Sequence, residues 1–231
     1  MIVFDFDGVL VNSANEIIVS SYNAVNGKLH KTLMDLPLEY INNFKNNIFH
    51  PRSGGEMVIL AKWCMENSKL SRVLSSQEYD EIKKIDEQNL KKYQNLFFKT
   101  RMSLHEKDSD ASLKLNTPFQ PIFDLASKIK NKIILTGKNS DYVIKLCDYY
   151  KFDIPRNCIF GGELGKSKTE IFNEISKLFP SQKYLFIEDS LQNLEKVKSN
   201  SIVSHKIEFF LVEWGFVSPA DFTPASTKGI Q

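Results

Sequence analysis

The chain has 231 residues, of which 42% are hydrophobic and 25% are charged, and its formal net charge is only +2. This length and composition are those of a globular protein with one large domain, or with a core and a smaller appended domain. The basic residues are spread along the chain, which argues against a nucleic-acid partner, and no apolar run approaches the roughly 20 residues of a membrane-spanning helix.

The cysteines Cys64, Cys147 and Cys158 show no CxxC spacing. They therefore indicate neither a disulfide framework nor a structural zinc site. No signal peptide precedes the first acidic residues, so we expect a cytoplasmic protein without a membrane partner. We expect it to be a monomer or a homodimer.

The N-terminus combines an apolar run with two acids. The apolar residues Ile2, Val3, Phe4 and Phe6 predict a strand buried on both faces, and the acids Asp5 and Asp7 stand between and after them. Gly8 allows a turn, so we expect Asp5 to end the strand and Asp7 to lie on the following loop. Two acids this close need a cation or a chemical task to offset their repulsion and desolvation, which favours a functional site over an acidic surface turn.

Residues 14–104 predict helices only, because their apolar residues recur at helical spacing. The predicted helices cover residues 17–25, 38–48 and 57–64, and one long helix runs from Ser75 or Ser76 to Phe97. The segment 105–117 is polar and lacks periodicity, so we expect it to be a linker.

Strands then alternate with helices up to the C-terminal region. The predicted strands are residues 132–136, 158–160, 184–187 and 208–212, and the predicted helices are residues 119–129, 143–150, 169–178 and 191–197. This alternation implies a parallel sheet with right-handed crossovers. The sequence therefore predicts an α/β protein: a Rossmann-like core of residues 1–13 and 105–231, with an all-helical cap domain of residues 14–104 inserted after the first strand.

Polar residues end three of the apolar strands. Asp5, Thr136 and Asp189 each follow such a run. Because ligands of open α/β sheets bind beyond the carboxyl ends of the strands, we expect these three side chains to meet at one site.

The same residues carry a resemblance to a known family. The stretch Asp5-Phe-Asp7-Gly8-Val-Leu-Val-Asn-Ser13 resembles the first motif, DxDGxxx(D/N)S, of the haloacid dehalogenase superfamily of phosphohydrolases. Thr136-Gly137 resembles the second motif, and Ile187-Glu188-Asp189-Ser190 resembles the fourth, acidic one. A helical insert after the first motif is typical of the phosphoglycolate phosphatase and β-phosphoglucomutase branch.

The third motif is a lysine at the start of a helix. Gly165-Lys166-Ser167-Lys168 offers two candidates. We prefer Lys166, which has the family spacing to the following Glu170-Ile-Phe172, and keep Lys168 as the alternative because it also begins the helix. Trp214-Gly215-Phe216 further resembles a Trp-Gly-Tyr found after the last strand in small-molecule phosphatases of this group.

The resemblance implies a role for each motif residue. Asp5 is the expected nucleophile, and Asp7 is the general acid that protonates the leaving oxygen and later deprotonates water. Asp5, the backbone carbonyl of Asp7, and Asp189 form a hard-oxygen site that suits Mg²⁺. The full expected site is Asp5, Asp7, Thr136 and Lys166 (or Lys168) for catalysis, Gly8, Thr136 and Gly137 for phosphate, Asp5, Asp7 and Asp189 for the metal, and Glu188 and Asn193 in support. Asn193 stands where many relatives have an acid, a departure expected to weaken metal affinity.

The resulting prediction is a Mg²⁺-dependent phosphatase that hydrolyses a small phosphorylated metabolite through an aspartyl phosphate. Two alternatives stay open: a phosphomutase, which returns the phosphoryl group to a sugar phosphate, and a weakly active phosphometabolite-binding protein on the same core. Arg52 in the cap is a candidate for binding a second anionic group of the substrate, although an exposed helix-cap turn explains it nearly as well.

Overall fold

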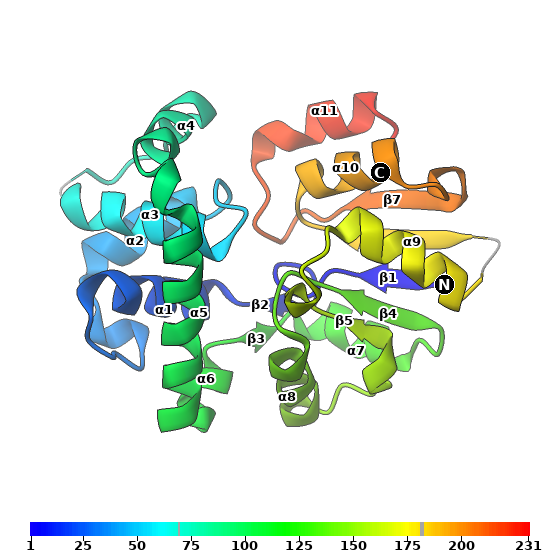
Figure 1. Ribbon diagram of the computed structural model, residues 1–231, viewed down its shortest axis with the longest axis horizontal. Coiled ribbons are helices and arrows are strands. Elements are labelled where there is room, and N and C mark those ends of the chain that lie inside the picture. Colours follow the sequence, from blue (N-terminus) through cyan, green and yellow to red (C-terminus); the bar gives the residue numbers. More distant parts are fainter. Residues whose placement is uncertain (69, 181–182) are drawn as a thin grey trace. The chain divides into compact units, whose positions relative to one another are not determined.

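The protein is described here from a computed structural model that covers residues 1–68, 70–180 and 183–231 (Figure 1). The chain divides into two compact units. The first consists of Met1–Asn12 and Thr117–Gln231, and the second of Ser13–Asn116. The predicted α/β core with an inserted helical segment is therefore confirmed. Within the described residues, no helix combines the length and apolarity needed to cross a membrane.

The first unit is built on a parallel sheet of five strands in the order β5-β4-β1-β6-β7. The strands are β1 (Ile2–Phe4), β4 (Lys132–Leu135), β5 (Ile159–Phe160), β6 (Tyr184–Glu188) and β7 (Ile207–Leu211). The N-terminal strand β1 is the central one, because Phe4 pairs with Ile134 of β4 on one side and with Ile187 of β6 on the other. The residues that follow β1 thus lie in the middle of the sheet's carboxyl edge.

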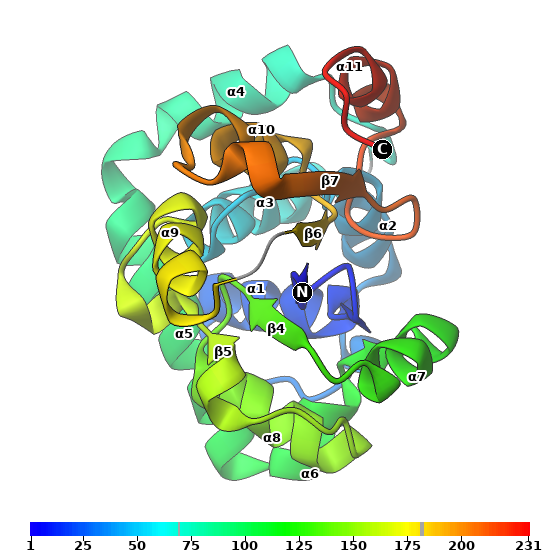
Figure 2. The ribbon, with the colours of Figure 1, turned by 90° about the vertical axis from the view of Figure 1, so that its right-hand side faces the viewer.

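Helices follow these strands in the alternating order that the sequence predicts. They are α7 (Gln120–Lys128), α8 (Ser140–Tyr150), α9 (Lys168–Leu178), α10 (Leu191–Asn200) and α11 (Phe222–Thr227). The chain moves outward from β4 to β5 through α8 and crosses back to β6 through α9, so right-handed crossovers place these two helices on opposite faces. Figure 2 shows α9 and α7 on opposite sides of β4.

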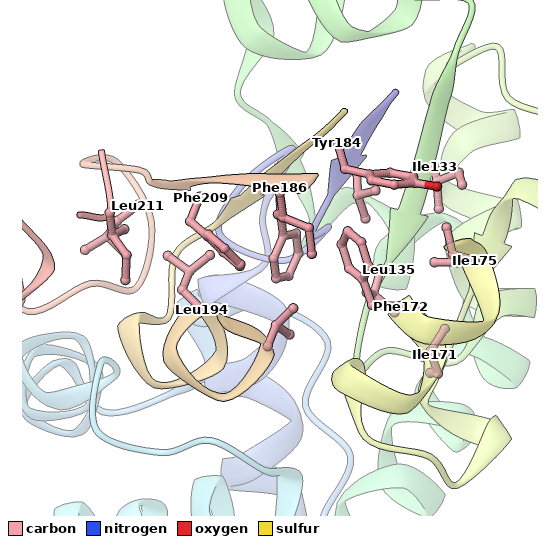
Figure 3. Packing of buried hydrophobic residues seen from close by; sticks show 14 of the residues in the cluster. Ile133, Leu135, Ile171, Phe172, Ile175, Tyr184, Phe186, Leu194, Phe209 and Leu211 are labelled. Atoms are coloured by element: carbon pink, nitrogen blue, oxygen red, sulfur yellow. The ribbon is translucent and has the colours of Figure 1, made fainter. Parts of the chain in front are cut away.

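The main hydrophobic core of this unit joins the sheet to α9 and α10 (Figure 3). At its centre Phe186 of β6 packs edge-on against Phe172 of α9, with ring centroids 5.5 Å apart, and against Phe209 of β7. Both faces of the sheet are covered, which explains why its strands are nearly continuous apolar runs. This packing holds the carboxyl ends of the strands in fixed positions.

A small antiparallel pair stands where the chain leaves and re-enters the first unit. The strands β2 (Val11–Asn12) and β3 (Thr117–Pro118) pair with each other, and the N–H of Phe119 donates to the carbonyl of Leu10. Sequence periodicity could not have predicted this pair, because two residues on each side form no pattern. It ties together the two connections to the inserted segment.

The second unit contains helices and no strand within its described residues, 13–68 and 70–116. Its α-helices are α1 (Ala14–Asn26), α2 (Leu38–Asn47), α3 (Gly54–Glu66), α4 (Ser76–Ile85), α5 (Leu90–Lys107) and α6 (Ser109–Lys114). Val58 of α3 and Phe97 of α5 pack with Ala24 of α1. A buried ion pair between Glu16 and Arg101, with two contacts of 2.8 Å, also joins α1 to α5.

The predicted long helix from residue 75 to Phe97 is wrong, because it is interrupted between Ile85 and Leu90. Ser75 does cap α4, as its capping-box spacing to Glu78 predicts. The break comes at Asp86, whose carboxylate accepts hydrogen bonds from Lys62, Asn89 and Tyr93. The backbone there forms tighter bonds, because the N–H of Asp86 donates to the carbonyl of Lys83 and the N–H of Asn89 donates to the carbonyl of Asp86.

The expected linker at residues 105–117 is also helical. The helix α5 continues to Lys107, and α6 follows at once. Asp108 begins α6 as its N-cap by accepting a hydrogen bond from the N–H of Ala111 at 3.1 Å. Leu104 and Leu113 are buried, so apolar contacts stabilise a segment whose overall polarity suggested a linker.

Candidate active site

Two acids of the first motif lie just beyond the central strand. Asp5 follows β1 directly, and its N–H donates to the carbonyl of Ile187 at 2.9 Å, which keeps Asp5 in line with the sheet. The carboxylate of Asp5 is buried, whereas the Asp7 side chain is 22% exposed. Gly8 has a φ of 79°, and its N–H donates to the carbonyl of Val11. This tight turn places Asp7 on the loop, as predicted.

A second pair of acids comes from the neighbouring strand. Glu188 is the last residue of β6, and Asp189 follows it. Glu188, Asp189 and Asp5 are all buried, and one carboxylate oxygen from each lies within 4.8 Å of the others. The structure thus brings together the predicted Asp5 and Asp189. Glu188, which was expected only to support them, contributes a carboxylate oxygen to the same cluster.

The lysine that reaches these acids is Lys168. Its Nζ lies 2.9 Å from Oδ1 of Asp5 and 2.5 Å from Oε2 of Glu188. Lys166, which the family spacing favoured, instead pairs with Glu174 on the surface, where both side chains are 44% exposed. Lys166, the preferred candidate, thus lies away from these acids, and Lys168, the alternative, is the lysine that contacts them.

The helix start explains which lysine reaches the site. Ser167 is the N-cap of α9 and forms a capping box with Glu170, so Lys168 is the first helical residue and Lys166 lies outside the helix. The capping-box pattern S-x-x-E is visible in the sequence. It is the signal that could have favoured Lys168 before the structure was known.

The electrostatics of the site favour the binding of a cation. Burial, followed by the nearby charge of Glu188, raises the pKa of Asp5 to about 8, even though Lys168 counteracts the rise. Burial and the charge of Asp5 raise the pKa of Asp189 to about 6, and burial also raises the pKa of Glu188. Burial opposes the charge of Lys168, but its two ion pairs outweigh that effect and raise its pKa. Three buried carboxyl groups therefore lie close together, and the ammonium group of Lys168 pairs with two of them, Asp5 and Glu188.

The same three acids fit a hard divalent cation. All their donor atoms are carboxylate oxygens, and all three residues are buried. Mg²⁺ prefers oxygen ligands and binds to few protein carboxylates. The donor set thus fits the predicted Mg²⁺, with Asp5 and Asp189 as the direct candidates.

A pH-dependent stability follows for the metal-free protein. Between pH 4 and 8, Asp5 is ionised in the unfolded chain but keeps its proton in the folded one, since its pKa rises from 3.8 to about 8. The folded state binds more protons, so its stability falls as the pH rises through this window. We expect Asp5→Asn to flatten this slope and to stabilise the metal-free protein at pH 8 by on the order of 1–3 kcal/mol.

Urea unfolding in EDTA at a series of pH values measures this effect. The exposed Asp148 provides a control, since Asp148→Asn should leave the slope unchanged. Equal slopes for the wild type and Asp5→Asn would contradict the expectation.

The acidic pair is held in place by the segment after β7. The N–H of Phe216 donates to Oδ2 of Asp189 at 2.7 Å, and Nε1 of Trp214 donates to the carbonyl of Val9 at 3.0 Å. A Cβ on Gly215 would lie 2.4 Å from Cβ of Asp189 and 2.5 Å from the carbonyl oxygen of Gly8. The sequence marked this Trp-Gly-Phe stretch only by resemblance, whereas the structure shows that Phe216 orients Asp189.

Replacing Gly215 by Ala is therefore expected to be costly. The new methyl group would overlap Asp189 and the backbone at Gly8, and we expect a loss of about 1–3 kcal/mol of stability. Gly137→Ala is the matched control, because a Cβ there meets no atom within 4 Å. Thermal unfolding of both variants checks this, and equal melting temperatures would contradict the close approach.

The second-motif residues lie at the end of β4. The N–H of Thr136 donates to the carbonyl of Phe160, and Oγ1 of Thr136 accepts a hydrogen bond from the N–H of Lys138 at 3.1 Å. Lys138 is buried, and its Nζ lies 2.8 Å from Oδ1 of Asp7.

Asn193 lies in the first turn of α10, where it supports Glu188. Its Nδ2 donates to Oε1 of Glu188 at 3.4 Å, and its N–H donates to Oγ of Ser190. An acid at this position could not donate that bond and would add a further negative charge beside Glu188. Arg52 belongs to the second unit, where it is exposed just before α3 and its N–H donates to Oε2 of Glu56. Its assignment to the substrate remains a prediction.

This architecture, an α/β core with a helical insertion after its first strand, is that of haloacid dehalogenase-like proteins. A haloacid dehalogenase-like hydrolase from Streptococcus pneumoniae is 14% identical, with a TM-score of 0.58 over 96% of this chain and 89% of that one. A predicted phosphoglycolate phosphatase from Haemophilus somnus is 15% identical, with a TM-score of 0.58 over 93% and 85% of the two chains.

A predicted phosphatase from Clostridium acetobutylicum is 16% identical, with a TM-score of 0.54 over 97% of this chain and 89% of that chain. No family model and no curated protein sequence matches the chain. At these identities, the likeness establishes the haloacid dehalogenase fold.

Proposed function

We propose that the protein belongs to the haloacid dehalogenase superfamily and is a Mg²⁺-dependent phosphatase that acts on a small phosphorylated metabolite. The observation that carries the proposal is the buried Asp5 at the end of the central strand, paired with Lys168 and flanked by Glu188 and Asp189. The fold shared with proteins named as phosphatases supports the same reading.

In this proposal Asp5 attacks the phosphorus of the substrate and the ester oxygen leaves, so that a phosphoryl group is bound to Asp5. Lys168 holds the Asp5 carboxylate and neutralises charge on the transferring group. A bound Mg²⁺ would supply further positive charge for the phosphoryl oxygens, with Asp5, Asp189 and the Asp7 carbonyl as its candidate ligands.

Asp7 is the residue that transfers protons in this proposal. Its side chain is partly exposed, unlike that of Asp5, so it is the acid that can exchange protons with bound groups. Asp7 protonates the leaving oxygen and then removes a proton from the water that hydrolyses the aspartyl phosphate. Thr136 and Gly137 are proposed to bind phosphate oxygens from the end of β4.

Release of p-nitrophenol from p-nitrophenyl phosphate, with and without Mg²⁺, tests the proposal. Hydrolysis that requires Mg²⁺ is the expected result. A second readout does not depend on activity: Mg²⁺ should raise the melting temperature of the wild type and have little effect on Asp189→Asn. Conversion of a sugar phosphate to an isomer, in place of phosphate release, would instead identify a phosphomutase.

A further inference from the structure

A buried lysine stands beside the second acid of the site. Lys138 is 2% exposed, and a charged side chain this deeply buried is rare unless it is paired. Its Nζ lies 2.8 Å from Oδ1 of Asp7 and 5.4 Å from the centre of the Tyr142 ring. Asp5 and Asp7 thus contact different lysines, Lys168 and Lys138 respectively.

The backbone of Lys138 is fixed on both sides. Its N–H donates to Oγ1 of Thr136 at 3.1 Å, and its carbonyl accepts a hydrogen bond from the N–H of Gly162 at 3.0 Å. A Cβ on Gly161 would lie 2.8 Å from the carbonyl oxygen of Lys138, and one on Gly162 would lie 2.3 Å from that of Gly137. The loops after β4 and β5 therefore pack backbone against backbone, which gives Lys138 a rigid support.

This support determines how the Asp7 carboxylate is oriented. Oδ1 of Asp7 is buried, whereas the side chain as a whole is 22% exposed, so its accessible part lies elsewhere on the side chain. Asp7 lies on a loop, where a carboxylate would otherwise sample several rotamers. A group that transfers a proton must be within hydrogen-bond reach of the reacting oxygen, so its orientation affects the rate.

We propose that Lys138 is a positioning residue, which binds Oδ1 of Asp7 and thereby orients the rest of the carboxylate for proton transfer to the leaving oxygen. This inference rests on the proposed phosphatase function. It assigns to the lysine after the Thr136-Gly137 pair a role in one chemical step, the departure of the leaving group, and not in phosphate binding.

The dependence of kcat/KM on the leaving group distinguishes a positioning role of Lys138 from a purely structural one. p-Nitrophenolate leaves without much help from an acid, whereas the more basic phenolate needs a proton. The experiment compares kcat/KM for p-nitrophenyl phosphate and phenyl phosphate, two substrates of similar shape. For Lys138→Met we expect a loss of about 10²-fold on phenyl phosphate and a much smaller loss on p-nitrophenyl phosphate.

Three variants sharpen the comparison. Asp7→Asn should show the same pattern. The substrate ratio is kcat/KM for p-nitrophenyl phosphate divided by kcat/KM for phenyl phosphate. Adding Lys138→Met to Asp7→Asn should change this ratio little further, because both changes remove the same step. Lys132→Met is the matched control. Lys132 is also buried, in β4, but its Nζ donates to the carbonyls of Ser127 and Ile129, so the substrate ratio should stay that of the wild type.

Equal losses on both substrates for Lys138→Met would overturn the inference and leave the phosphatase proposal intact. The absence of Asp5-dependent hydrolysis in the wild type would overturn both. Circular dichroism checks the folding of each variant. If Lys138→Met does not fold, Lys138→Arg is measured in its place, because Arg keeps the positive charge but places its N–H groups differently against Oδ1 of Asp7. An increased substrate ratio for Lys138→Arg supports the inference, and an unchanged ratio contradicts it.

Discussion

Asp5→Asn is expected to reduce phosphatase activity by about 10⁵-fold, to the level of the assay background. Asn has nearly the same shape as Asp, but its neutral amide is a poor nucleophile and cannot form the acyl phosphate. The carboxylate of Asp5 is held by Lys168 at the end of the central strand, and no other acid in the described site has both its position and its burial.

Steady-state hydrolysis of p-nitrophenyl phosphate measures the effect. The matched control is Asp148→Asn, whose exposed carboxylate lies on α8, and which should retain wild-type kinetics. Substantial Mg²⁺-dependent turnover by Asp5→Asn would show that another group attacks the phosphorus.

The second large effect is expected for Lys168 but not for Lys166, two positions before it. Lys168→Met should lower kcat by about 10²–10³-fold, because it removes a preorganised positive charge from the reacting group. It also leaves Asp5 and Glu188 without their shared ammonium partner, so the metal-free variant should melt at a lower temperature. Lys166→Met removes only an exposed pair with Glu174 and should leave both quantities nearly unchanged.

The two variants are measured side by side by kinetics and thermal unfolding. Similar losses for both, or a larger loss for Lys166→Met, would contradict the assignment. The sequence could have favoured Lys168 through the Ser167–Glu170 capping box, but the motif spacing pointed to its neighbour.

The alternation of strands and helices was predictable because both faces of the sheet are covered and its strands are short apolar runs between polar helix faces. The edge of the sheet that carries Asp5, Thr136 and Asp189 followed from topology alone. Burial of a charged residue is harder to predict. Nothing in Thr136-Gly137-Lys138 indicates that the lysine turns inward, since its partner Asp7 is distant in sequence and Gly162 holds its backbone.

The helical insertion was predicted as a class but not in its details. Local periodicity identified its helices, whereas the break near Asp86 depends on side-chain partners from α3 and α5. The segment after residue 105 is polar in composition, yet its helix is fixed by a few buried leucines and the Asp108 cap. Such contacts form only when the helices are assembled, so a pattern within one segment cannot reveal them.

The residue that accepts the phosphoryl group can be identified directly. Asp7→Asn should slow the breakdown of an aspartyl phosphate, so this variant is mixed with p-nitrophenyl phosphate and Mg²⁺, quenched in acid and digested for mass spectrometry. We expect one added phosphoryl group on Asp5, absent from the double variant with Asp5→Asn. A phosphoryl group on another residue, or continued hydrolysis by the double variant, would contradict it.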